Sequence, residues 1–90
     1  MIDVKEATQT ALEYFQDIYS DQSFSNVLLE EVEREQDDDT SYWFITIGFT
    51  EQRDGPFGGH LNVSRRYKRF KIDAETGEVL AMKIRSVENA

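Results

Sequence analysis

The sequence predicts an α+β domain in which one N-terminal amphipathic helix packs on a four-stranded antiparallel meander sheet. Three observations predict this class: apolar residues recur at threes and fours over residues 4–19, the apolar period changes to two from residue 27 onward, and short turn-forming segments separate the periodic runs. Because 90 residues would leave two domains each near the smallest size that supports a core, we expect residues 1–90 to form a single domain.

The helix is predicted from one apolar face that repeats at helical spacing. Its members are Val4, Ala7, Ala11, Leu12, Phe15, Ile18 and Tyr19. Asp3 followed by Glu6 has the form of a capping box, in which both side chains satisfy backbone N–H groups of the first turn, so the helix should begin near Asp3. It should end at residues 20–23, whose polar side chains compete with helical hydrogen bonds.

The first two strands are expected at residues 27–36 and 42–50. The first strand has Leu28, Leu29 and Val32 as its apolar anchors. The second alternates clearly and should turn one face to the core, with Trp43, Ile45, Ile47 and Phe49 on that face. Residues 37–41 between the strands contain three adjacent aspartates, whose mutual repulsion favours a solvated loop.

Two further strands should complete the sheet. Residues 51–60 contain three glycines and the only proline, so we expect them to connect strands. The third strand is predicted over 61–72, with a shift in apolar phase between Tyr67 and Phe70 that a β-bulge would explain. Residues 73–77 should form a tight turn, in which Asp73 accepts backbone hydrogen bonds and Gly77 takes a positive φ. The last strand then covers 78–87, and residues 88–90 fray.

The predicted core lies between the helix and one face of the sheet. From the helix it takes Ala7, Ala11, Phe15 and Ile18, and from the sheet Trp43, Ile45, Ile47, Phe49, Phe70, Ile72, Leu80, Met82 and Ile84.

The C-terminal third of the chain resembles the signature of PepSY domains, which combines an aromatic strand, a V/I-D-A-x-T-G-x-V-L hairpin and a closing strand. Here the hairpin reads Ile72-Asp73-Ala74-Glu75-Thr76-Gly77-Glu78-Val79-Leu80. The resemblance covers residues 67–84, and the upstream helix and the strand at 42–50 fit the helix-on-sheet plan of that family in outline. The resemblance implies a small non-catalytic domain that inhibits or regulates peptidases. The PepSY family has no catalytic residues to carry over to this chain.

Charge and composition exclude several classes of function. The net charge of -8 argues against duplex nucleic acid or an anionic membrane as the main partner. The charge is unevenly spread, because residues 1–41 hold twelve acidic and two basic residues whereas residues 42–90 hold six acidic and eight basic ones. Without cysteine there is no disulfide, thiolate nucleophile or Cys-ligated zinc, and we expect no cofactor. An acidic start and the absence of a long apolar run predict a cytoplasmic protein with no membrane association.

An enzyme or a metal site finds little support in the sequence. The single histidine, His60, follows two glycines, and we interpret it as a solvated loop residue because no spacing provides it with a catalytic partner. The acidic run could suggest a calcium site, but it lacks the glycine and the spacing of an EF-hand loop. We therefore expect no enzymatic activity and no metal.

Candidate partner-binding residues occur in three places. The acidic run could dock a basic partner through Glu31, Glu33, Glu35, Asp37, Asp38 and Asp39. The basic strand around Arg66 and Lys68 has the composition of an RNA-binding strand, although pairing with the protein's own acidic residues is the simpler interpretation. Phe57, in the glycine-rich loop, is either an exposed binding anchor or a cover for the sheet edge.

We thus expect a non-enzymatic domain that binds a protein or peptide. Two alternatives stay open: an acidic immunity-type protein that binds a basic toxin, and a minor nucleic-acid-binding role through Arg65–Lys71. A homodimer formed by pairing of an edge strand is a further possibility, which the glutamates of the first strand would discourage.

Overall fold

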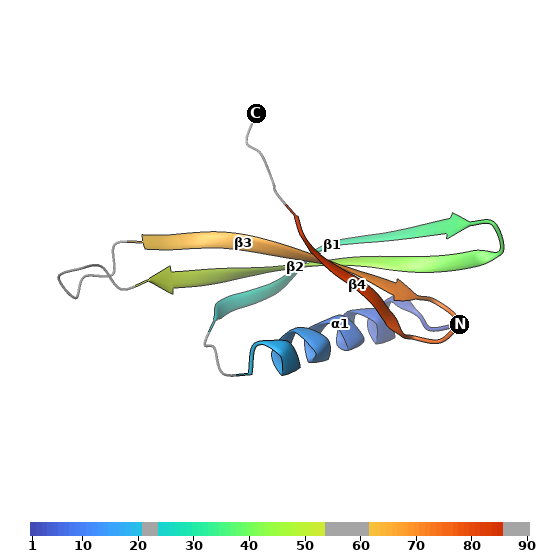
Figure 1. Ribbon diagram of the computed structural model, residues 1–90, viewed down its shortest axis with the longest axis horizontal. Coiled ribbons are helices and arrows are strands. Elements are labelled where there is room, and N and C mark those ends of the chain that lie inside the picture. Colours follow the sequence, from blue (N-terminus) through green and yellow to red (C-terminus); the bar gives the residue numbers. More distant parts are fainter. Residues whose placement is uncertain (21–23, 54–61, 86–90) are drawn as a thin grey trace, which may run out of the picture.

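The computed structural model describes residues 1–20, 24–53 and 62–85 and has the α+β fold that the sequence predicts. In chain order the elements are α1 (Val4–Ile18), β1 (Ser25–Asp37), β2 (Thr40–Arg53), β3 (Asn62–Asp73) and β4 (Val79–Ile84). The strands form one antiparallel sheet in the order β1-β2-β3-β4, and α1 lies across one face of it (Figure 1). Within the described residues no helix is long and apolar enough to span a membrane.

The two faces of the sheet differ in what covers them. We call the face beneath α1 the helix face, and the opposite one the open face. Ile45, Ile47 and Phe49 of β2 point to the helix face and are buried. The alternate residues Phe44, Thr46 and Gly48 point to the open face, which no described element covers. Direct pairing places Phe70 and Ile72 of β3 on the helix face as well, because they lie opposite Ile45 and Trp43.

The helix begins as the sequence predicts. Asp3 is the N-cap, and its Oδ1 accepts a hydrogen bond from the backbone N–H of Glu6 at 2.9 Å. Tyr19 is the C-cap, one residue before the polar segment predicted to end the helix. Ala7, Ala11 and Phe15 form the buried stripe, and the two alanines allow the helix to lie close to the sheet.

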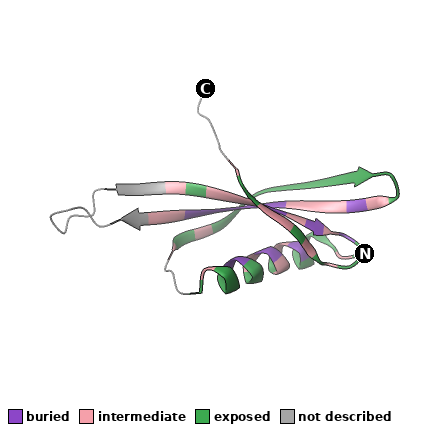
Figure 2. Ribbon diagram, in the orientation of Figure 1, coloured by how far each residue is buried: buried purple, intermediate pink, exposed green. Residues whose placement is uncertain are grey.

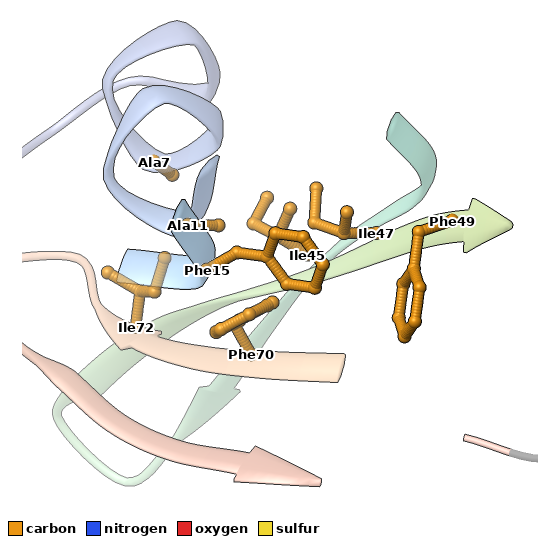
Figure 3. Packing of buried hydrophobic residues seen from close by; sticks show 8 residues of the cluster. All are labelled: Ala7, Ala11, Phe15, Ile45, Ile47, Phe49, Phe70 and Ile72. Atoms are coloured by element: carbon orange, nitrogen blue, oxygen red, sulfur yellow. The ribbon is translucent and has the colours of Figure 1, made fainter. Parts of the chain in front are cut away.

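The core lies where α1 crosses β2 and β3. Figure 3 shows Phe15 pointing from α1 toward the isoleucines of β2 and toward Phe70. The fully packed members are Ala7, Ala11, Phe15, Ile45, Ile47, Phe49, Phe70 and Ile72, all of which the sequence predicts. Phe15 also contacts Phe24 and Phe49, with ring centroids 5.8 Å and 5.0 Å away, so an aromatic cluster extends the core toward the end of α1.

Three residues predicted for the core are exposed. Ile18 lies at the last turn of α1, and Ile84, which is 74% exposed, ends β4 beyond the reach of the helix. Leu80 is exposed because the β3–β4 pairing shifts between Lys71 and Ile72, so that it lines the open face. Trp43 and Met82 pack against the core but are only partly buried.

The apolar anchors predicted for β1 are exposed too. The side chains of Leu28, Leu29 and Val32 are all exposed, and Figure 2 shows β1 exposed along nearly its whole length. A helix about 10 Å across covers about two strands that are spaced about 4.8 Å apart. Since α1 lies against β2, β3 and β4, it leaves β1 outside the core.

Element boundaries differ from the prediction at both ends of the β1–β2 hairpin. The loop predicted for 37–41 is a two-residue turn at Asp38 and Asp39, because Asp37 and Thr40 already pair; Asp38 has a φ of 54°. β2 continues past residue 50 to Arg53.

The last two strands also differ from the prediction. No bulge interrupts the β2–β3 pairing, where the apolar phase suggested one, and the irregularity lies in the β3–β4 pairing instead. β4 ends at Ile84 rather than at residue 87; residues 86 and 87 lie outside the described part.

The β3–β4 turn has the chemistry that the sequence predicts. Asp73 Oδ1 accepts hydrogen bonds from the backbone N–H groups of Glu75 and Thr76, at 2.8 Å and 3.3 Å. Gly77 has a φ of 77°, and its N–H donates to the carbonyl of Asp73 at 2.8 Å. The N-terminal segment lies beside this turn, since the N–H of Ile2 donates to the carbonyl of Ala74 at 2.7 Å.

Candidate functional site

Ion pairs across the open face join β1 to the basic residues that follow it in the chain. Glu30 pairs with Arg65 at 2.6 Å, and Glu33 with Arg69 at 3.5 Å. Glu31 accepts two hydrogen bonds from Arg85, 2.6 Å from Nε and 3.3 Å from Nη2. Three glutamates of the acidic first half of the sequence are thus paired with arginines of the basic second half across the sheet.

The Glu30–Arg65 pair explains why Gly48 stands in the middle of β2. A Cβ at this buried position would lie 2.7 Å from Cγ of Glu30 and 2.8 Å from Nη2 of Arg65. The two side chains therefore cross directly over the glycine, and any larger residue would displace them.

The ion pair between Glu31 and Arg85 shifts the pKa of both partners. The hydrogen bond from Arg85 lowers the pKa of the Glu31 carboxyl below its ordinary value, with the positive charge of Arg85 acting in the same direction. The same contact raises the pKa of Arg85. Thr46, which also hydrogen-bonds Glu31, is only 2% exposed although it faces away from the helix.

The acidic candidates separate into two groups. Glu31 and Glu33 are paired with arginines, so their charge is compensated within the chain. The others lie exposed at the hairpin end of β1 and in the turn, and make no ion pair within the described residues: Glu35, Asp37, Asp38 and Asp39. Uncompensated negative charge is thus concentrated at one end of the β1–β2 hairpin.

The basic candidates point away from the open face. Arg66 and Lys68 lie on the helix face, because they pair directly with Phe49 and Ile47. Arg66 Nε lies 2.7 Å from Oε2 of Glu51. The open face instead carries Arg65, Arg69 and Lys71, so the basic strand is divided between the two sides of the sheet. Arg65, Arg66 and Arg69 all pair with the protein's own glutamates, in agreement with the simpler interpretation of this strand.

Cations cover the aromatic residues on the open face. The guanidinium of Arg69 lies 4.4 Å from the ring centroid of Phe44, and Nζ of Lys71 lies 4.2 Å from that of Tyr42. On the helix face Arg34 lies 5.8 Å from the Trp43 ring. The protein's own cations therefore occupy one side of these rings, which makes the rings less available for stacking with bases.

The outer side of β1 adjoins an apolar groove. β1 is an edge strand that pairs with β2 alone among the described strands, so its outer backbone groups have no ladder partner there. On the helix face a shallow groove of about 310 Å³ separates it from α1, lined by Val4, Lys5, Thr8, Gln9 and Leu29. Leu29 is 44% exposed in this groove.

Phe57 and His60 lie outside the described residues. In the part that is described, no three His, Asp or Glu side chains gather closely enough to hold a metal ion. Comparison with family models, curated proteins and solved structures gives no match to this chain.

Sequence reasoning overlooked two parts of the open face. The sequence pattern does not bring Arg85 and Glu31 together, because their contact depends on the register of three strand pairs. The cations around Phe44 were also overlooked. The alternation of β2 already placed Phe44 opposite the core face, and that signal could have identified it as a surface residue.

Proposed function

We propose that the chain is a PepSY-like, non-catalytic domain that binds an extended basic segment of a protein or peptide along β1. The observation that carries this proposal is the combination found on β1. Its outer edge pairs with no described strand, an apolar groove adjoins it, and the carboxylates at one end make no ion pair within the described residues.

The edge of β1 provides the backbone contacts. An added strand gains main-chain hydrogen bonds that do not depend on its sequence, and pockets for alternate side chains then give specificity. β1 has 13 residues, which is long enough for a complete strand to pair with it.

The groove and the carboxylates set the chemistry of the partner. Apolar side chains of the partner strand would contact Leu29 and Val32, which are exposed next to α1. Basic side chains would meet Glu35, Asp37 and the two turn aspartates, and these charges would also accelerate the encounter. The same carboxylates disfavour β1–β1 pairing between two copies, because like charges directly opposite each other destabilise a strand pair.

The PepSY part of the proposal is supported by the β3–β4 hairpin. The residues that carry the resemblance form two paired strands joined by the Asp73–Gly77 turn. A domain of this kind would regulate a peptidase or another protein by capturing a segment rather than by cleaving it. An immunity-type protein that captures a basic toxin would use the same chemistry. Nucleic acid has less support, because Arg65 and Arg69 are paired with glutamates.

Fluorescence anisotropy with labelled peptides tests the proposal. A peptide of about ten residues with alternating Lys and Val should bind, whereas its Glu-Val counterpart should not. Raising the salt from about 0.05 M to about 0.5 M should weaken binding. NMR shift changes should concentrate on β1.

Charge reversal provides the matched control. Glu35→Lys with Asp37→Lys should weaken the Lys-Val peptide about tenfold or more, since two carboxylate contacts are lost and replaced by repulsion. Glu13→Lys with Asp17→Lys makes the same change in net charge on the exposed side of α1 and should leave most of the affinity. Equal affinity in both double variants, or shift changes away from β1, would overturn the proposal.

A further inference from the structure

A hollow on the open face is separate from β1 and is lined by cations. It has a volume of about 340 Å³ and lies over β3 and β4. Phe44, Leu80 and Ala81 provide its apolar surface, and Arg69, Lys71 and Lys83 provide its charge. Three of the ten basic residues of a chain with net charge -8 therefore gather around one depression.

The positive charges of the hollow are only partly compensated. Arg69 lies directly opposite Lys83 in the β3–β4 pairing, an arrangement in which like charges repel. Arg69 pairs with Glu33 at a long distance of 3.5 Å, and its charge also helps to lower the pKa of Glu31. Lys83 is exposed and, like Lys71, makes no ion pair within the described residues. An anion placed between these side chains would relieve their repulsion.

The apolar surface indicates that the anion carries an organic body. Leu80 is 45% exposed and points to the open face as a result of the register shift between β3 and β4. Phe44 lies at the same depression, and Arg69 covers its ring. Burying these side chains would contribute to the affinity for an aromatic ligand, whereas inorganic phosphate could use only the charges.

We propose that this hollow binds a small aromatic carboxylate, with the carboxylate between Lys83 and Arg69 and the ring against Leu80 and Ala81. The site lies on the face opposite α1, so it is independent of the groove beside β1. A third positive charge, on Lys71, lies at the same hollow and favours an anion over a neutral ligand.

Calorimetry and NMR with 2-naphthoate as the probe test this inference. The probe should bind with shift changes around residues 69, 81 and 83, while neutral 2-naphthamide and inorganic phosphate should each bind more weakly. Lys83→Gln should lower the affinity for 2-naphthoate about fivefold, as expected for the loss of one partly exposed charge contact. Lys68→Gln removes the same charge on the helix face of the sheet and should leave the affinity unchanged.

Two more variants separate the charge from the apolar contribution. Leu80→Ala should lower the affinity for 2-naphthoate but not the affinity for phosphate. Glu33→Gln should strengthen the binding of 2-naphthoate, because it removes the carboxylate that pairs with Arg69. Equal binding of 2-naphthoate and 2-naphthamide, or an equal loss of affinity in the Lys83 and Lys68 variants, would overturn the proposal. Phosphate binding as tightly as 2-naphthoate would instead indicate an inorganic-anion site and would overturn the aromatic part.

Discussion

Arg85 and Glu31 are 54 residues apart in the chain and belong to opposite edges of the sheet, yet Arg85 Nε lies 2.6 Å from Glu31 Oε1. Arg85 follows β4 directly, and its N–H donates to the carbonyl of Tyr67 on β3. The guanidinium of Arg85 and the carboxylate of Glu31 thus meet although β2 and β3 separate β1 from β4 in the sheet order. The twist of the sheet, which turns β4 steeply across the direction of β2 in Figure 1, makes this contact possible.

The first prediction concerns the pH dependence of this pair. The folded-state pKa of Glu31 lies below its ordinary value of 4.5, mainly because Arg85 donates a hydrogen bond to the carboxylate. The resulting stabilisation is therefore present above pH 4.5 and is lost as the pH falls through the lowered pKa. In a carboxyl NMR titration, Arg85→Gln should raise the pKa of Glu31. The same Glu31 titration curve in both proteins would contradict the contact.

The second prediction distinguishes the core from the exposed apolar residues. Phe70→Ala should lower the free energy of unfolding by about 3–5 kcal/mol, because it leaves a cavity among fully buried neighbours. Ile84→Ala should change it by less than about 0.5 kcal/mol, since Ile84 is largely exposed. Urea unfolding measures both values. Similar losses would show that Ile84 is buried in the core, as the sequence predicts.

The third prediction concerns the β3–β4 turn. Gly77→Ala should destabilise the protein by about 1–2 kcal/mol, because a residue with a Cβ is strained at a φ of 77°. Glu75→Ala, in the same turn but exposed, is the control and should be close to neutral. Thermal unfolding monitored by circular dichroism compares the two, and a neutral Gly77→Ala would argue against this turn geometry.

The fourth prediction concerns the helix start. Asp3→Ala should lower the free energy of unfolding by about 0.5–2 kcal/mol, because the backbone N–H of Glu6 loses its acceptor. Asp3→Asn keeps a side-chain oxygen at the N-cap and should retain most of the stability. Asp17→Ala removes an equal charge at an exposed position near the other end of α1. If Asp17→Ala were as costly as Asp3→Ala, net charge rather than capping would explain the loss.

The sequence predicted those features that depend on neighbours in the chain. The alternation from Trp43 to Phe49 identified the core face of β2, and Asp3 and Gly77 identified a helix start and a turn. Each of these rests on local hydrogen bonding, on backbone sterics or on side chains that alternate along a single strand.

Features that depend on register or on the width of the helix could not be predicted in the same way. A shift of one residue in the β3–β4 pairing places Leu80 on the open face, and no residue next to Leu80 in the chain indicates that shift. Leu29 and Val32 are apolar, but their exposure follows from where α1 lies across the sheet. The split of the acidic residues into paired and unpaired groups likewise depends on which arginines the sheet brings opposite them.

The placement of β1 outside the core has a consequence for local opening. None of the fully buried apolar residues belongs to β1, whereas α1, β2 and β3 supply all but one of them; the last, Ala74, lies in the β3–β4 turn. Backbone pairing with β2, a few ion pairs and the partly buried Val27 hold β1 in place, so most of β1 can separate without breaking the core. The amides of β1 should therefore exchange with solvent through sub-global opening, while the central amides of β2 exchange only when the whole domain unfolds.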